Sequence, residues 1–192
     1  MTPTSNQIVL RVIDALERLD IPYMLVGSYA SNSYGVARST QDADFVISLG
    51  SQTIVPLADA LKPDIILDPQ LAFESVTMTS RFLARHKSSP FKVELFLTTD
   101  DPHDRIRFER RQRRQFLDRE AWLPTAEDVI VQKLRWFVRV RRTKDLDDAR
   151  NVVSVRIGTL DLAHIRHWCD QHGSRQVFED LLREAEEFRA RP

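Results

Sequence analysis

Residues 23–28 read Tyr-Met-Leu-Val-Gly-Ser, and residues 42–47 read Asp-Ala-Asp-Phe-Val-Ile. The first stretch is a short apolar run closed by a glycine–serine turn, which predicts a buried strand over Tyr23–Val26. The second stretch alternates carboxylates with apolar residues, which predicts a strand over Ala43–Ser48 that Asp42 leads into. Two strands of this kind, separated by a short predicted helix over Tyr29–Tyr34, indicate a mixed α/β fold.

The two aspartates of the second strand are expected to project together. Alternate residues of a strand point to the same side, so the carboxylates of Asp42 and Asp44 lie roughly 7 Å apart. Like charges repel, and a bound divalent cation such as Mg²⁺, which prefers hard oxygen ligands, would remove that conflict. The alternative interpretation is that Asp42 is a turn residue and Asp44 is simply solvated.

A third carboxylate, Glu94, lies on the polar side of a strand predicted over Phe91–Leu97. If this strand lies beside the second one, Glu94 can reach Asp42 and Asp44. Two metal ions could then be shared, and Glu94 would be the general base or a metal ligand. The alternative for Glu94 is an exposed strand position paired with a lysine.

The turn at Gly27-Ser28 has the features of a phosphate-binding element. A glycine lets the backbone approach a phosphate closely, because it has no Cβ. The start of the following helix would supply free N–H groups, and the hydroxyl of Ser28 is a further donor. This combination predicts a grip on the phosphates of a nucleoside triphosphate (NTP).

The remaining elements divide the chain into a catalytic domain over residues 1–123 and a helical domain over residues 124–192 that completes the nucleotide and acceptor cleft. We expect an α/β (α+β) fold in which a small mixed sheet with flanking helices precedes a C-terminal helical bundle. The first domain is predicted to contain further helices over Ser5–Leu19, 51–61 and His103–Gln115, and strands over Ile65–Leu67 and Thr77–Ala84. The second is predicted to contain helices over Thr125–Val140, Lys144–Val153, Thr159–His172 and Gln176–Arg189.

The composition excludes several classes of protein. The 192 residues carry 28 basic and 28 acidic side chains, so overall charge does not indicate nucleic-acid or membrane binding. A single cysteine, Cys169, excludes a disulfide framework and a thiolate metal cage. The absence of a signal pattern and of any bilayer-length apolar run predicts a soluble, cytoplasmic protein with no membrane partner.

The stretch Leu25-Val26-Gly27-Ser28, followed after thirteen residues by Asp42-Ala43-Asp44-Phe45, resembles the signature of the DNA polymerase β-like nucleotidyltransferase superfamily. The resemblance implies the α/β fold of that superfamily and an enzyme with two catalytic Mg²⁺ ions. It also implies the transfer of a nucleoside monophosphate from an NTP to an acceptor, with release of pyrophosphate.

Residues 124–153 resemble the helical segment of AbiEii-type nucleotidyltransferases, the toxin components of type IV toxin–antitoxin systems. Lys133 and Arg139 match a lysine followed six residues later by an arginine, and Asp145 and Asp148 match a K-D-x-x-D motif. The resemblance makes Lys133 a triphosphate ligand, adds Arg139 to the nucleotide-binding residues, and makes Asp145 or Asp148 a second acidic element. This chain is shorter than the typical toxin. Judged from the residues alone, Lys133 belongs to the solvated side of an amphipathic helix.

Two arginine clusters bear on the acceptor. One contains Arg105, Arg107, Arg110, Arg111, Arg113 and Arg114, and the other contains Arg135, Arg139, Arg141 and Arg142. Arginines among aromatic residues suit RNA, so RNA or tRNA is a candidate acceptor; solvated, ion-paired helices explain the clusters equally well. The alternatives are a small acceptor such as an aminoglycoside, a protein hydroxyl, or an inactive fold that binds a partner such as a cognate antitoxin.

Overall fold

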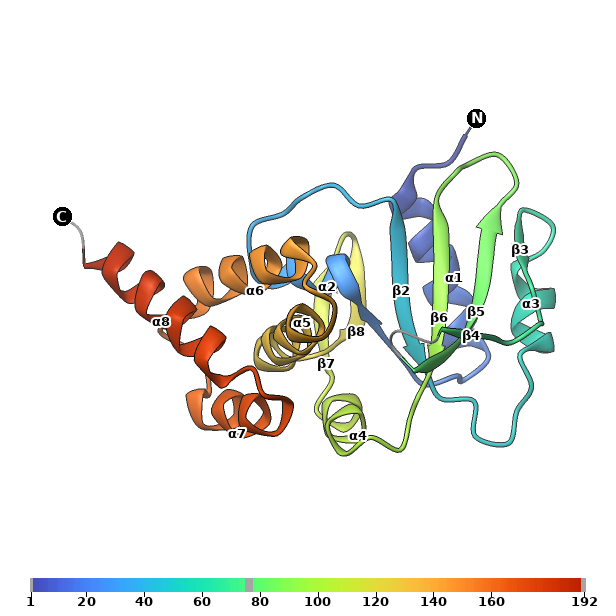
Figure 1. Cartoon of the computed structure of the whole chain (residues 1–192). Coiled ribbons are helices and arrows are strands. Elements are labelled where there is room, and N and C mark those ends of the chain that lie inside the picture. The colour runs from blue at the N-terminus through green and yellow to red at the C-terminus, as the bar shows by residue number, and fades with distance from the viewer. Residues whose placement is uncertain (1, 75–77, 191–192) are drawn as a thin grey trace. The chain divides into compact units, whose positions relative to one another are not determined.

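The computed structural model describes residues 2–74 and 78–190, which form two compact units. The first, here called the sheet unit, contains the residues up to Tyr29 together with Ser39–Leu123. The second, the helical unit, contains Ala30–Arg38 together with the residues from Pro124 onward. Figure 1 labels the elements along the chain. Thr77, where the sequence predicted that a strand begins, lies outside the described residues.

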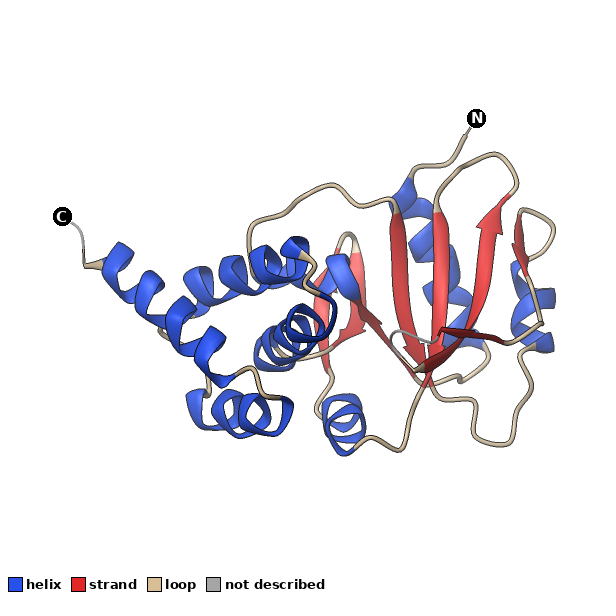
Figure 2. Ribbon diagram, viewed as in Figure 1, coloured by secondary structure: helices blue, strands red, loops and turns tan. Residues whose placement is uncertain are grey.

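The sheet unit is built on a mixed sheet, shown in red in Figure 2. In the described part of the chain, its strands follow the order β1-β2-β6-β5-β3, and β4 also pairs with β5. Strands β2 and β6 are parallel, and the other pairs are antiparallel. The strands are β1 (Tyr23–Val26), β2 (Asp42–Ile47), β3 (Ile65–Leu67), β4 (Ala72–Glu74), β5 (Thr79–His86) and β6 (Lys92–Leu97). The predicted mixed α/β fold is thereby confirmed.

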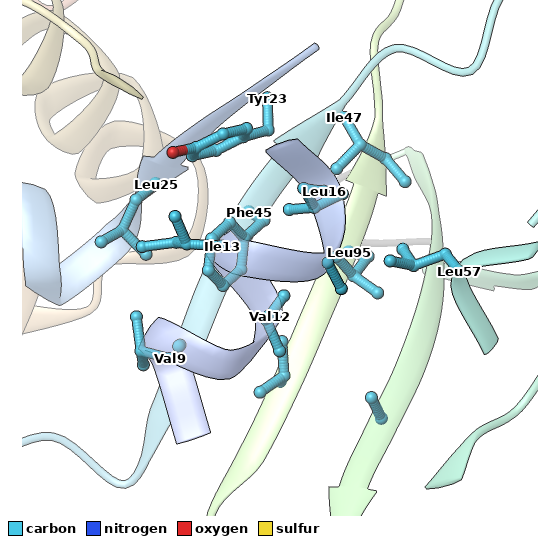
Figure 3. Packing of buried hydrophobic residues seen from close by; sticks show 14 of the residues in the cluster. Val9, Val12, Ile13, Leu16, Tyr23, Leu25, Phe45, Ile47, Leu57 and Leu95 are labelled. Carbon is cyan, nitrogen blue, oxygen red and sulfur yellow. The ribbon is translucent and has the colours of Figure 1, made fainter. Parts of the chain in front are cut away.

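One face of this sheet is apolar and buried. Helix α1 (Ser5–Arg18) and helix α3 (Val55–Leu61) pack on it, and Figure 3 shows Val9, Val12 and Ile13 of α1 against Phe45 of β2. The strand residues on this face include Tyr23, Leu25, Ala43, Phe45, Ile47, Ile65, Leu67, Phe82, Ala84, Val93 and Leu95. Because side chains alternate along a strand, the residues between them face the opposite side of the sheet.

The helix over residues 103–115 was predicted wrongly. Helix α4 (Pro102–Glu109) ends at Glu109, and residues after it form a hairpin of β7 (Gln112–Phe116) and β8 (Arg119–Leu123). Phe116, Ala121 and Leu123 of this hairpin are buried in the same core as the sheet. The density of charged residues hid this strand pattern, because four of the five residues of β7 are exposed and carry no apolar periodicity.

The helical unit contains α5 (Ala126–Val140), α6 (Thr143–Arg156), α7 (Leu162–His172) and α8 (Arg175–Arg189). Helix α2 (Gly27–Tyr34) begins in the sheet unit, and its residues from Ala30 onward group with these helices. The core of the helical unit includes Tyr34, Ile130, Val153 and Phe178. In the described residues, no helix combines the length and apolarity required to cross a bilayer.

Candidate active site

Strand register brings the three predicted carboxylates of the sheet unit onto one face. Asp44 lies directly between Val26 of β1 and Glu94 of β6, because it is in register with both. Asp42 is two residues earlier on β2 and therefore faces the same side. All three carboxylate residues are partly buried. The parallel pairing of β2 with β6 thus meets the condition under which Glu94 was expected to join the aspartates.

The backbone of Gly27 lies directly against the Asp44 carboxylate. Its φ is +60°, a left-handed conformation that favours glycine. A Cβ built on Gly27 would stand 2.0 Å from Oδ2 of Asp44 and 2.9 Å from its Cγ, much closer than van der Waals contact allows. The glycine is therefore required both by the backbone turn and by the space that Asp44 occupies. The buried Ser28 follows at the first turn of α2.

Asp42 is held by a local contact and influences a neighbouring tyrosine. The hydroxyl of Thr40 donates a hydrogen bond of 2.9 Å to Oδ1 of Asp42. Burial, and then the negative charge of Asp42, raise the pKa of Tyr29 above its ordinary value. The ring of Tyr29 packs edge-on against Phe91 and Phe116. These contacts hold Tyr29, and with it the adjacent Ser28, against the core.

Glu94 has a partner that the sequence did not indicate. Nη1 of Arg81, on the adjacent strand β5, lies 3.0 Å from Oε2 of Glu94. The guanidinium of Arg81 also lies over the ring of Phe96, 5.8 Å from its centroid. Arg81 is in register with Phe96, so the arginine and the glutamate share one sheet face and meet diagonally. The alternation of Arg81 with buried Phe82 and Ala84 was the one available signal of this placement.

The same face becomes apolar toward the other end of the strands. Met24, Val26 and Val46 form a small buried cluster with Phe96 and with Phe108 of α4. Beyond it is a hollow of about 380 Å³. Its lining residues include Ser48, Thr98 and Phe108, and none of the candidate carboxylates is among them. We therefore assign the candidate site to the polar end of the sheet and not to this hollow.

In the helical unit, the lysine and the two aspartates of the resemblance form a buried ionic network. Nζ of Lys133 lies 3.1 Å from Oδ1 of Asp145 and 2.7 Å from Oδ2 of Asp148. Arg142 reaches the other oxygen of Asp145 at 2.8 Å. Arg38 binds both oxygens of Asp148 through Nε at 2.7 Å and Nη2 at 2.9 Å. The aspartates therefore hold three cations in place.

This network affects the ionisation of Asp148. Burial alone would raise the pKa of Asp148, but the hydrogen bonds and charges of Arg38 and Lys133 outweigh it and lower the pKa below its usual value. Arg38, which the sequence did not indicate, lies 110 residues before its partner. Arg139 is exposed and does not belong to this network; its guanidinium lies 5.7 Å from the ring centroid of Trp136.

Many of the clustered arginines are ion-paired. Arg105 pairs with Asp100, Arg107 with Asp104 at 2.8 Å, and Arg113 with Glu17 at 3.3 Å. Arg111 lies between two aromatic rings, at 4.2 Å from the centroid of Phe108 and 5.0 Å from that of Trp122, and its burial lowers its pKa. These contacts are structural. They account for much of the first cluster without a nucleic-acid ligand.

The chemistry of the carboxylate face fits a hard divalent cation. Three carboxylates on neighbouring strand positions offer oxygen ligands of the kind that Mg²⁺ prefers. Gly27 and the start of α2 stand beside them, where an anionic ligand can approach backbone N–H groups. The arrangement can therefore bring a metal ion and a phosphate group together.

Comparison with solved structures shows which fold this is. The crystal structure of ANT(2″)-Ia in complex with adenylyl-2″-tobramycin superimposes with a TM-score of 0.60 at 14% identity, covering 91% of this chain and 99% of the other. The solution structure of the antibiotic-resistance factor ANT(2″)-Ia gives 0.55 at 14% identity and covers 98% of each chain. An antigenic nucleotidyltransferase-like protein from Paracoccidioides brasiliensis gives 0.56 at 15% identity, covering 94% of this chain and 93% of the other.

The chain therefore has the fold of nucleotidyltransferases, as the resemblance of its strand and turn motifs implied. No protein-family model matches the sequence, and a search of curated proteins finds no match. At 14–15% identity the likeness concerns the fold, and the activity must be argued from the residues of the site.

Proposed function

We propose that this protein is a metal-dependent nucleotidyltransferase that moves a nucleoside monophosphate from an NTP to an acceptor hydroxyl. The observation that carries the proposal is the row Val26–Asp44–Glu94, in register across β1, β2 and β6, with Gly27 against the Asp44 carboxylate. Two central strands that existed only for stability would gain nothing from adjacent carboxylates, because like charges opposite one another destabilise a sheet.

The carboxylates and the glycine–serine turn would each have a separate task. Asp42 and Asp44, with Glu94 as a third oxygen ligand, would hold Mg²⁺. The resemblance to the polymerase β-like superfamily implies two such ions. A divalent cation held there would neutralise phosphate charge and polarise the reacting groups. Ser28 and the backbone at Gly27 bind phosphate oxygens of the NTP. The roles of these residues are consistent with catalysis by positioning and electrostatics.

The reaction forms one bond and breaks another. The acceptor oxygen attacks the α-phosphorus, the bond to the β-phosphate oxygen breaks, and pyrophosphate leaves. The proton of the acceptor hydroxyl passes to a carboxylate, for which Glu94 is the candidate if it is not occupied as a ligand. Lys133 is the candidate for neutralising pyrophosphate, as the resemblance to AbiEii-type enzymes implies, and its contacts with Asp145 and Asp148 hold its ammonium group in place.

The surroundings of the carboxylates favour an anionic acceptor. Lys92 of β6 is in register with Asp42 on one side and with Arg85 of β5 on the other, and both cations are exposed. Two like charges on neighbouring strands attract a phosphate group, which a chain of RNA places next to each of its hydroxyls. We therefore propose RNA, including tRNA, as the acceptor, as the resemblance to AbiEii-type toxins implies.

A small-molecule acceptor is the second candidate, and one observation favours it. ANT(2″)-Ia, whose structure contains adenylyl-2″-tobramycin, shares the fold over nearly the whole chain. Tobramycin is a polycation, and Lys92 and Arg85 would repel it. Transfer to a protein hydroxyl and an inactive, antitoxin-like binding role are further alternatives that the experiment below separates.

The test is a labelling reaction. The protein is incubated with Mg²⁺, total RNA and each of the four α-³²P-labelled NTPs in turn, and the products are separated into RNA, protein and small molecules. We expect label in RNA with at least one NTP, and none with the Asp44→Ala variant. Asp59→Ala is the matched control, because the carboxylate of Asp59 is exposed and pairs with Lys62 on the surface.

The pattern of label decides between the candidates. Label in added tobramycin but not in RNA would replace the RNA proposal with the small-molecule one, and label in protein would indicate a protein hydroxyl. No label with any NTP, in RNA, protein or tobramycin, would contradict the catalytic proposal and leave the inactive binding role as the explanation.

A further inference from the structure

Arg81 is the charged residue of the carboxylate face that the reaction does not use. It lies on β5, two strands away from Asp44, and its Nη1 is 3.0 Å from Oε2 of Glu94. The side chains of both partners are mostly shielded, with 27% of Arg81 and 19% of Glu94 exposed. An ion pair with this degree of burial is screened less than a surface pair, so it influences what else Glu94 can bind.

The environment of Arg81 does not provide a hydrogen-bond acceptor for each of its buried N–H groups. The ring of Phe96 supports the guanidinium from one side. Within the described part of the chain, however, Nε of Arg81 is buried and has no hydrogen-bond partner. A buried N–H without an acceptor is costly, and such exceptions in a polar site are often tied to function. The guanidinium is therefore anchored chiefly through Glu94 and the aromatic ring.

Charge balance explains why Glu94 has this partner. Asp42, Asp44 and Glu94 place three carboxylates on adjacent positions, and without a cation they would repel one another. Lys92 and Arg85 of the same face are exposed, whereas Arg81 supplies a positive charge in direct contact with Glu94. A divalent cation would supply the same compensation, and it would meet electrostatic repulsion from a guanidinium a few ångströms away.

We propose that Arg81 is an internal counter-cation of the site, which binds Glu94 in the metal-free protein and competes with a divalent cation for that carboxylate. This inference rests on the proposed function, because it requires the carboxylate face to bind metal. It assigns Arg81 a role as a positioning residue: the arginine keeps the face ordered while it is empty and limits how tightly metal is held. Moderate affinity lets metal arrive and leave with the nucleotide.

The test measures binding of Mn²⁺ alone to the whole protein, by the loss of the free-ion electron paramagnetic resonance signal. Arg81→Met removes the charge and keeps an aliphatic stem against Phe96, and Arg81→Gln is a second neutral variant in case the first does not fold. Arg81→Lys keeps the charge and is the matched control. Circular dichroism establishes that each variant is folded.

We expect either neutral variant to bind Mn²⁺ about tenfold more tightly than the parent, because Glu94 is then released from its ion pair with Arg81 and can bind the metal. Arg81→Lys should stay within about threefold of the parent. In an Glu94→Gln background the gain should disappear, because the carboxylate that Arg81 competes for is absent. A structural role for Arg81 would not tighten metal binding at all.

The outcomes separate this inference from the proposed function. Equal or weaker Mn²⁺ binding by both neutral variants, or a gain that persists without Glu94, would overturn the role of Arg81 and leave the nucleotidyltransferase proposal intact. Binding that does not depend on Asp44, or no Mn²⁺ binding by the parent and the neutral variants alike, would overturn the metal site and with it both proposals.

Discussion

Replacement of Gly27 by alanine tests the geometry beneath Asp44. Two costs follow from the structure. Alanine at a φ of +60° is strained, which costs about 1–2 kcal/mol. The new Cβ would also stand 2.0 Å from Oδ2 of Asp44, and forcing the carboxylate aside costs about 1–3 kcal/mol as overpacking. The free energy of unfolding should therefore fall by about 2–5 kcal/mol in Gly27→Ala.

Gly50→Ala is the matched control for this variant. Gly50 has a φ of +56°, and nothing lies within 4 Å of a Cβ built there. It should therefore show the cost of strain alone, about 1–2 kcal/mol. Urea unfolding followed by tryptophan fluorescence measures both variants against the parent, in the same buffer without metal.

A double-mutant cycle isolates the contact with Asp44. In an Asp44→Ala background the carboxylate that collides with the new Cβ is gone and only the Cβ of residue 44 remains near it, at 3.1 Å, so the cost of Gly27→Ala should fall most of the way to that of Gly50→Ala. If Gly27→Ala is no more costly than Gly50→Ala, or equally costly with and without the Asp44 carboxylate, the close approach of Gly27 to Asp44 does not exist in solution.

Three further predictions concern other parts of the chain. Asp148→Asn should lower the free energy of unfolding by about 2–4 kcal/mol at pH 7, because it leaves Lys133 and Arg38 without their shared carboxylate. The pKa of folded Asp148 lies below the unfolded value of about 3.9, so its stabilisation is present above that value and lost as the pH falls through the folded pKa. Urea unfolding should therefore show the same difference from the parent at pH 7 and 5 and a smaller one at pH 3, and a constant difference would contradict the assignment. Burial raises the pKa of Cys169 to about 11, so the native protein at pH 8 should react with a disulfide reagent far more slowly than the protein in guanidinium chloride; equal rates would show that Cys169 is accessible. The double variant Arg85→Glu and Lys92→Glu should reduce labelling of RNA at least tenfold without loss of NTP binding. The control double variant Arg183→Glu and Arg189→Glu, on α8, should leave labelling of RNA unchanged. Equal labelling by both double variants would show that Arg85 and Lys92 do not bind the acceptor.

Local patterns in the sequence predicted the parts of the site that depend on one element. Strand alternation was enough to place Asp42 and Asp44 on the side opposite Phe45, and the burial of Phe45 agrees with it. The glycine after β1 was expected to allow a close approach. In the structure the group closest to Gly27 is the Asp44 carboxylate, and the sequence around Gly27 does not indicate this contact with another strand.

The parts that depend on pairing between distant segments could not be predicted in this way. Glu94 reaches Asp44 only because β6 pairs in parallel with β2, and alternation along β6 says nothing about its neighbour. Arg81 and Arg38 have partners on other elements, so no spacing in their own segments distinguishes them from solvated arginines. In β7, exposed arginines and glutamines carried no periodic signal, so the strand could not be told from a continuation of the preceding helix.

The path of the chain between its two units limits how the protein can be divided. The chain leaves the sheet unit after Tyr29, returns at Ser39, and leaves again after Leu123. Tyr34 donates a hydrogen bond to the carbonyl of Pro124, and Arg38 binds Asp148. The segment Ala30–Arg38 is therefore held by residues much later in the chain. A fragment that stops at Leu123 would lose the partners of the segment between Gly27-Ser28 and Asp42. Neither unit is thus a module that recombination could exchange by a single cut, and the turn and the carboxylates would have to be inherited together with the helices.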